Sequence, residues 1–158
     1  MKLQKLLVPV DFSRCSETAV RYAKLMATKF SARIHLIHVV DKRYVEKIAE
    51  LNGESEDEVS KKLSLQAKKN LERFLANNDS EGLVAEKIIT VGIPFQAIAL
   101  RAQALGTDMI VMGGHGRVGN GQIDKIFFGS AAERVVRLLP CPVLCVPQDD
   151  VVIETGEK

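Results

Sequence analysis

The chain has 158 residues, 46% of them hydrophobic and 27% charged, which is the composition of one globular domain with a sizeable core. The formal net charge is only +2, and aromatic residues make up 5% with no Trp, so no nucleic-acid surface is indicated. The first apolar stretch meets Pro9 and Asp11 after a few residues, too soon for a secretion signal or a membrane span, and we therefore expect a cytoplasmic protein without membrane contact.

Five short runs rich in Val and Ile, bounded by Asp, Gly or Pro, predict β-strands. They span residues 5–10, 33–40, 84–91, 109–113 and 142–147. Apolar residues spaced three and four apart predict helices between the strands. The helical patterns cover residues 16–30, 44–78 with an interruption at Asn52-Gly53, 95–105 and 131–139.

This alternation of helices with mostly apolar strands predicts a doubly wound α/β fold, in which a five-stranded parallel sheet has helices on both faces. Ser13 or Ser16 is the expected cap of the first helix. Ser55 and Glu58 form the pattern of a capping box at the start of a later helix. We expect one domain over residues 1–147, followed by a C-terminal tail over residues 148–158.

Open parallel sheets bind ligands at the carboxyl ends of their strands, where the winding of the chain reverses. The first strand runs into Asp11, and the fourth runs into Gly113 and a glycine-rich stretch that ends at Gly129 and Ser130. If these two strands are neighbours, Asp11 faces the glycines. Glycines let backbone N–H groups converge on an anion, and a helix beginning at Gly129 adds its dipole.

A phosphate chain would supply enough acceptors for this stretch, with the Ser130 hydroxyl and the side chain of Arg117 as further donors. The Asp11 carboxylate is poorly suited to phosphate but can accept hydrogen bonds from ribose hydroxyls. Together these residues predict a nucleotide site.

Two common nucleotide motifs do not account for this stretch. The chain has no Walker loop, which requires Gly-x4-Gly-Lys and then Ser or Thr. Gly114, Gly116 and Gly119 match the Gly-x-Gly-x-x-Gly spacing of dinucleotide sites. That fingerprint belongs after the first strand and opens a helix at once, whereas here it follows the fourth strand, so NAD-type binding is disfavoured.

Taken together, these motifs resemble the universal stress protein family over about residues 2–147. The family carries VPVD or a similar string on its first strand, an HV pair on its second, Gly-x-Pro before its third helix, and a glycine pattern ending in Gly-Ser or Gly-Thr. The matching positions here are Val8 to Asp11, His38-Val39, Gly92 to Pro94, and Gly113 to Ser130. The family spacing is Gly-x2-Gly-x9-Gly-Ser/Thr. Counted from Gly113 at the strand end, the register we prefer, the loop between Gly116 and Gly129 is three residues longer than this spacing, whereas Gly116, Gly119, Gly129 and Ser130 satisfy it but begin three residues beyond the strand.

The resemblance implies a Rossmann-like, adenine nucleotide alpha hydrolase-like domain that binds ATP, forms a homodimer through its last strand and takes part in stress responses. It implies adenine near Pro9 and the backbone of Val39, and ribose near Asp11 and Gly113. Phosphates would meet Gly116, Gly129 and Ser130, with Mg or Mn bound through the phosphates and no metal ligand from the protein.

Several plainer interpretations stay open. Asp11 could merely cap the first helix, and Gly129-Ser130 could merely begin the last one. His35 and His38 are expected to be packed or hydrogen-bonded, whereas His115 in the loop could be catalytic. Cys141 and Cys145 would lie about 13 Å apart on an extended strand, beyond disulfide reach, and we expect all three cysteines of the chain to be reduced.

Three functions are compatible with the sequence. The favoured one is a dimeric, ATP-dependent regulatory module that acts on a protein partner not identified by the sequence. An enzyme, either a slow ATPase or an autophosphorylating protein, is disfavoured because no Lys follows the loop glycines and Ser130 has no evident activating base; we assign no catalytic residue. The third is a dimeric interaction scaffold without nucleotide.

Overall fold

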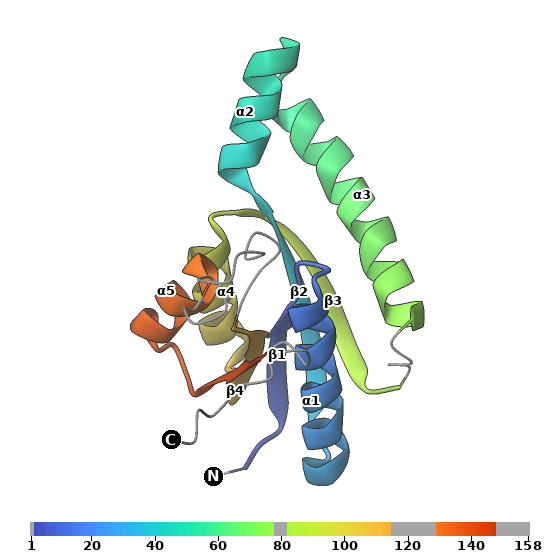
Figure 1. The fold of residues 1–158 in the computed structure, drawn as a ribbon, viewed down its shortest axis with the longest axis vertical. Helices are drawn as coiled ribbons and strands as arrows, with labels where there is room; N and C mark the ends of the chain where they lie inside the picture. The colour runs from blue at the N-terminus through green and yellow to red at the C-terminus, as the bar shows by residue number, and fades with distance from the viewer. Residues whose placement is uncertain (1, 78–81, 115–128, 148–158) are drawn as a thin grey trace, which may run out of the picture.

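The computed structural model describes residues 2–77, 82–114 and 129–147 (Figure 1). Its five strands form one sheet in the order β3-β2-β1-β4-β5, and every pair of neighbours is parallel. The strands are β1 (Lys5–Pro9), β2 (Arg33–Asp41), β3 (Val84–Gly92), β4 (Met109–Gly113) and β5 (Val143–Val146). All five agree with the predicted strands to within one residue at each end. The predicted doubly wound five-stranded parallel sheet is therefore confirmed.

In the described ranges, five helices connect the strands. They are α1 (Arg14–Phe30), α2 (Lys42–Asn52), α3 (Glu56–Asn77), α4 (Pro94–Leu105) and α5 (Ser130–Leu138). Of the two candidate caps of α1, Ser13 is the cap, because its side chain accepts a hydrogen bond from the Ser16 N–H. The predicted interruption between α2 and α3 is confirmed at Gly53, which takes a φ of 64° that favours glycine.

The helices lie on both faces of the sheet, with α1 and α3 on one face and α4 and α5 on the other (Figure 1). Alternate residues of each strand point to opposite faces. In β1, Leu6 and Val8 join the core under α1 and α3, whereas Leu7 joins the core under α4 and α5. All three side chains are fully buried, so β1 is the centre of both cores.

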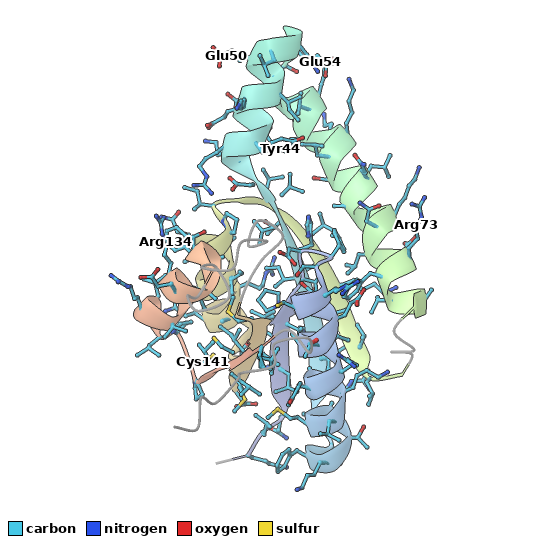
Figure 2. The ribbon with its side chains drawn as sticks, in the orientation of Figure 1. Tyr44, Glu50, Glu54, Arg73, Arg134 and Cys141 are labelled. Carbon is cyan, nitrogen blue, oxygen red and sulfur yellow. The ribbon has the colours of Figure 1, made fainter. Side chains whose placement is uncertain are left out.

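Helices α2 and α3 form a hairpin that extends beyond the carboxyl edge of the sheet (Figure 1). A third apolar cluster joins the hairpin to the sheet, in which Val45 and Ala49 of α2 meet Val59 and Ala67 of α3 and Val40 of β2. The exposed side chains of Tyr44 and Glu50 and the half-buried side chain of Glu54 lie on this hairpin, and Arg73 lies near the opposite end of α3 (Figure 2).

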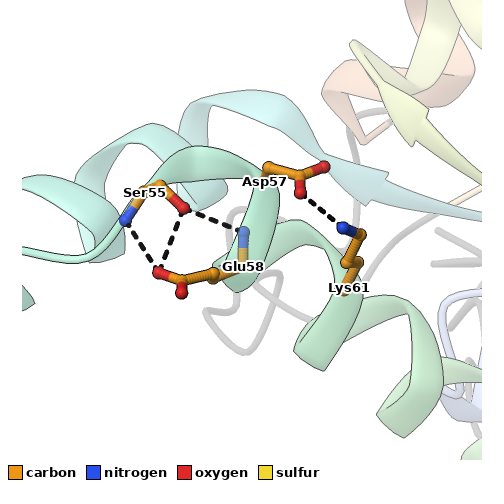
Figure 3. Close-up of polar contacts among 4 residues, drawn as sticks. All are labelled: Ser55, Asp57, Glu58 and Lys61. Atoms are coloured by element: carbon orange, nitrogen blue, oxygen red, sulfur yellow. Dashed lines mark hydrogen bonds and ion pairs between the residues drawn. The ribbon is translucent and has the colours of Figure 1, made fainter.

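The capping box predicted at the start of α3 is confirmed (Figure 3). The Glu58 N–H donates to the Ser55 hydroxyl at 3.3 Å, while the Ser55 N–H and hydroxyl donate to the Glu58 carboxylate at 3.3 and 3.0 Å. One turn on, the Lys61 ammonium pairs with the Asp57 carboxylate at 2.5 Å. The capping box provides hydrogen-bond partners for backbone N–H groups at the start of this charged, exposed helix, and the ion pair adds support one turn on.

The three cysteines are free, as expected. Burial raises the pKa of the Cys141 and Cys145 thiols, which disfavours the reactive thiolate form. Within the ranges that the structure describes, no helix is both long enough and apolar enough to cross a bilayer.

Candidate functional site

The condition on which the predicted site depends, that β1 and β4 are neighbours, is met. The two strands pair in register, with Leu6 opposite Met109 and Leu7 opposite Ile110. Helix α1, which follows β1, covers one face of the sheet, and α5, which follows β4, covers the other. The winding of the chain therefore reverses between these two strands, and ligands of open parallel sheets bind at such a point.

Hydrogen bonds bring three further chain segments to the same edge. His38 of β2 contacts the Val10 carbonyl through Nδ1 at 2.8 Å, so Val39 lies close to the end of β1. The Gly114 N–H donates to the Val146 carbonyl at 2.8 Å, and the Gly129 N–H donates to the Gly114 carbonyl at 2.7 Å. The start of α5 is thus held against the end of β4.

Six of the eight predicted site residues consequently lie at one edge of the sheet. They are Pro9, Asp11, Val39, Gly113, Gly129 and Ser130. Gly116 and Arg117 lie outside the described residues, as does His115, so their predicted roles stay predictions.

The Asp11 carboxylate is held by the start of α1. Its Oδ1 accepts hydrogen bonds from the Ser13 N–H at 3.1 Å, the Ser13 hydroxyl at 2.5 Å and the Ser16 hydroxyl at 2.5 Å. The alternative that Asp11 caps the first helix is wrong, because the cap is Ser13, although the Asp11 carboxylate accepts hydrogen bonds from the start of that helix. This anchoring does not exclude a ligand, because an ionised carboxylate has two oxygens and about four acceptor sites.

The residue after Asp11 was not singled out from the sequence. Phe12 has a φ of 66°, a left-handed conformation that costs a residue with a side chain roughly 1–2 kcal/mol. Its ring stacks on His38 with centroids 4.5 Å apart and meets the edge of Phe74 at 5.8 Å. These contacts hold the strained turn, and they confirm that His38 is a packed and hydrogen-bonded residue.

His35, the other strand histidine, also has a structural partner. Its Nδ1 lies 3.2 Å from the Glu86 carboxylate on β3, and its side chain is 14% exposed. The expectation that it is packed or hydrogen-bonded is therefore confirmed.

Gly113 has a packing role that the sequence did not reveal. A Cβ atom at this position would lie 2.6 Å from the Cβ of Cys15 and 3.1 Å from its carbonyl carbon. The first turn of α1 therefore rests directly on the end of β4, and only a residue without a side chain permits this approach. The contact brings the Asp11 turn beside the glycine that begins the stretch toward α5.

Helix α5 begins at this edge without help from a side chain at its cap. The cap is Gly129, in an extended conformation with φ −61° and ψ 149°, and its own N–H is used by Gly114. Ser130 is exposed at the first helical position. The N–H groups at the start of a helix, together with its dipole, favour an anion.

Helix α5 carries a cation that contacts the neighbouring helix, and charge also decides whether side chains could hold a metal ion. Arg134, one turn into α5, lies over the Phe95 ring of α4 at 4.9 Å from its centroid, and it was not predicted (Figure 2). No cluster of three or more His, Cys, Asp or Glu residues that could hold a metal ion occurs within residues 2–77, 82–114 and 129–147.

Comparisons with known proteins agree with this architecture. The sequence pattern of the Universal stress protein family matches residues 2–147. The universal stress protein MJ0577 of Methanocaldococcus jannaschii is 34% identical over 155 residues, which cover 90% of this chain and 94% of that protein. The solved structure of MJ0577 has a TM-score of 0.80 at 32% identity and covers 96% of this chain and 100% of its own.

Two more distant structures have the same fold and were solved with nucleotides. One is a universal stress protein in complex with cAMP, with a TM-score of 0.64 at 21% identity, covering 92% of this chain and 98% of its own. The other is the universal stress protein from Archaeoglobus fulgidus in complex with dAMP, with a TM-score of 0.57 at 22% identity and the same coverage of 92% and 98%. From its sequence pattern, its sheet and its relatives, this chain belongs to the universal stress protein family.

Proposed function

We propose that this protein binds ATP at the edge of the sheet between β1 and β4 and acts as a nucleotide-dependent regulatory module in a stress response. One observation supports this most strongly. An anchored carboxylate, Asp11, and a helix start capped by Gly129 occupy the two sides of a reversal in chain winding. A hydrogen-bond acceptor for ribose beside an anion site suits a nucleotide better than it suits a sugar alone or a phosphate alone.

In this proposal Asp11 accepts hydrogen bonds from the ribose, near Gly113. The adenine lies by Pro9 and the backbone of Val39. The phosphates meet the first turn of α5 at Gly129 and Ser130. Because the Gly129 N–H already donates to Gly114, the donors from this turn are the N–H groups that follow it and the Ser130 hydroxyl. Gly116 and Arg117 complete the phosphate site from the loop.

A divalent ion, Mg or Mn, is proposed to be held through the phosphates of ATP. The residues of the predicted site fit such an ion, because they include a single carboxylate, Asp11. Its Oδ1 already accepts hydrogen bonds from Ser13 and Ser16, so the phosphates would supply the main ligands of the ion. Mg²⁺ is commonly held by one or two carboxylates together with substrate phosphates and water, without an all-protein cage.

The regulatory module is proposed to be a cytoplasmic homodimer that presents a nucleotide-dependent surface to a protein partner, with one domain over residues 1–147 and a tail after it. Strand β5 lies at an edge of the sheet, where a second copy could pair with it. The carbonyls of Pro142 and Val146 accept hydrogen bonds from Ile110 of β4 and from Gly114, the residue after β4. Because backbone groups alternate along a parallel strand, those of Val143 and Cys145 face the outer edge.

The nucleotide proposal is tested first on protein as purified. We expect the denatured protein to release ATP or ADP, and the stripped protein to bind ATP with Mg²⁺ in a calorimetric titration. Gly129→Val should abolish that binding by setting a branched side chain in the path of the phosphates, and should leave the melting temperature nearly unchanged because φ −61° suits any residue.

Two results would contradict the proposal. Neither released nucleotide nor heat of binding would leave a nucleotide-free interaction scaffold. Wild-type affinity in Gly129→Val would show that ATP binds elsewhere on the protein.

The dimer is tested by light scattering after size-exclusion chromatography. Cys145→Pro removes an outward N–H from β5 while the ladder to β4 is kept, so we expect the dimer to dissociate at concentrations where the wild type stays paired. Cys145→Ala is the matched control, since it loses the same side chain but keeps the N–H. A dimer that survives Cys145→Pro unchanged would mean a different interface.

A further inference from the structure

Ser16 lies in the first turn of α1, and its hydroxyl makes two hydrogen bonds with Asp11. Its hydroxyl donates to Asp11 Oδ1 at 2.5 Å and accepts a hydrogen bond from the Asp11 N–H at 3.0 Å. The residue is only 4% exposed, although a serine in the first turn of a helix is usually at the surface. One buried hydroxyl therefore holds both the side chain and the main chain of the same aspartate.

Ser13 adds to this anchoring. Its N–H and its hydroxyl also donate to Asp11 Oδ1, so three donors converge on one carboxylate oxygen. The two serines are linked as well, because the Ser16 N–H donates to the Ser13 hydroxyl at 3.3 Å. A carboxylate with one oxygen held from three directions loses most of its rotational freedom before any ligand arrives.

The backbone of the turn is restrained at the same time. Phe12, between Asp11 and Ser13, has a φ of 66° and is held between His38 and Phe74. A strained conformation persists only where the surrounding structure determines it, and such residues gather at binding sites. The side chain and the backbone of Asp11 are thus both fixed by contacts within the protein.

We propose that Ser16 is a positioning residue for ribose recognition, holding the Asp11 carboxylate in the orientation that accepts a ribose hydroxyl. The inference rests on the proposed function, and it assigns the preference for a ribonucleotide to a residue that does not itself touch the ligand. An acceptor oriented in advance spares the ligand the entropy of ordering it. Removing the Ser16 hydroxyl takes away one of the three donors to Asp11 Oδ1 and the acceptor of the Asp11 N–H, so that the carboxylate is held less firmly by the two remaining Ser13 donors.

The test compares ATP with 2′,3′-dideoxy-ATP, which lacks both ribose hydroxyls, by calorimetric titration with Mg²⁺. Wild-type protein should bind ATP more tightly than the dideoxy analogue. Ser16→Ala should weaken ATP binding about tenfold and leave the affinity for the dideoxy analogue unchanged, so that the preference for ATP is largely lost.

Thr18→Val is the matched control. Thr18 is also on α1 and is 2% exposed, and its hydroxyl donates to the Arg14 carbonyl at 3.2 Å and accepts a hydrogen bond from the Arg21 guanidinium at 3.1 Å. The variant loses a buried hydroxyl from the same helix at nearly constant volume. It should keep the wild-type preference for ATP.

Ser13→Ala provides a second variant should Ser16→Ala not fold. It removes one of the three donors to Asp11 Oδ1 while the Ser13 N–H and the Ser16 hydroxyl stay. We expect ATP binding to weaken about threefold, again without a change in the affinity for the dideoxy analogue.

The outcomes separate the inference from the function on which it rests. Equal weakening of ATP and the dideoxy analogue in Ser16→Ala would reduce Ser16 to a structural residue, and no weakening would show that Asp11 does not need it. A wild type that binds both nucleotides equally would remove the ribose role of Asp11 while nucleotide binding stands. A wild type that binds neither would overturn the proposed function and this inference together.

Discussion

Two aspartates, Asp108 and Asp11, lie at opposite ends of strand β1, and their carboxylates are held in different ways. At the amino edge of the sheet, Asp108 precedes β4 and accepts hydrogen bonds from the N–H groups of Gln4 and Lys5, both at 2.8 Å. At the carboxyl edge, Asp11 follows β1 and is held by one N–H and two serine hydroxyls.

The amino edge is closed by further contacts between the same segments. The Asp108 N–H donates to the Lys5 carbonyl at 3.0 Å, and the Lys5 ammonium donates to the Leu105 carbonyl at 2.9 Å. Asp108 thus ties the start of β1 to the start of β4. Asp11 instead is tied to its own following helix, so its carboxylate is oriented without joining the two strands. One carboxylate thus joins two strands at the amino edge, whereas the other holds the turn into α1 at the carboxyl edge and is the proposed ribose acceptor.

The largest expected effect comes from breaking the close contact at the carboxyl edge. Gly113→Ala sets a Cβ atom 2.6 Å from the Cβ of Cys15, and the neighbouring atoms belong to the Cys15 backbone, which cannot move aside alone. We expect a loss of about 3 kcal/mol in the free energy of unfolding, measured by urea denaturation.

Gly92→Ala, at the end of β3, is the matched control because its Cβ atom meets Ala97 at an ordinary 3.5 Å. It should change stability by less than about 1 kcal/mol. Cys15→Ala should not rescue Gly113→Ala, since the Cβ and backbone of residue 15 remain. A stable Gly113→Ala protein would mean that α1 can shift away from β4.

The next effect concerns Asp11. Asp11→Ala leaves the buried Ser16 hydroxyl without its acceptor, and we expect a loss of about 2 kcal/mol in the free energy of unfolding. Asp11→Asn retains an acceptor oxygen and should be less destabilising, about 1 kcal/mol, while ATP affinity still falls because the charge-assisted bonds to ribose are lost.

These two variants separate the structural and ligand roles of the carboxylate. Thermal melts and ATP titrations are measured on the same preparations. Unchanged ATP affinity in a folded Asp11→Asn protein would reduce Asp11 to a residue that supports the start of α1.

The third effect is smaller. Asp108→Ala removes the acceptor of the Gln4 and Lys5 N–H groups, but water can replace it because these groups are near the surface. We expect a loss of about 1 kcal/mol in the free energy of unfolding and no change in the affinity for ATP. A change in ATP affinity comparable to that of Asp11→Asn would contradict the separation of the two edges.

The smallest effect is a dependence on pH. Hydrogen bonds from the backbone of Gln4 and Lys5 hold the pKa of Asp108 below its usual value of 3.8. Since the folded-state pKa is the lower one, the stabilisation is fully present above pH 3.8 and is lost as the pH falls through the folded-state pKa. The difference in melting temperature between wild type and Asp108→Asn should therefore shrink in acid below pH 3.8. A difference that stays constant down to the acid transition would contradict this linkage.

Much of this architecture could be predicted because its signals are local. The apolar runs of the strands, the capping box of Ser55 and Glu58 and the turn at Gly53 each depend on residues a few positions apart. Asp11 and Gly113 could be proposed as site residues because the carboxyl ends of parallel strands meet at one edge. Their adjacency still required β1 and β4 to be neighbours, and the order of the strands decided that.

Other features depend on residues far apart in the chain. The role of Asp108 rests on β1, more than a hundred residues earlier. The left-handed Phe12 is held by His38 and Phe74, and nothing around Phe12 in the sequence indicates a positive φ. Gly113 was interpreted as a ligand-contacting glycine, whereas its contact with Cys15 supplies a packing reason as well.

The sequence by itself determined the alternation of strands and helices, the parallel sheet and the residues at its carboxyl edge, because hydrophobic period and turn chemistry act over a few residues. Tertiary structure alone decided that the Ser16 hydroxyl is buried against Asp11, that Phe12 is strained, and that α1 rests on Gly113. These depend on how closely α1 packs on the ends of β1, β2 and β4, which is a matter of side-chain volume and burial across the whole sheet.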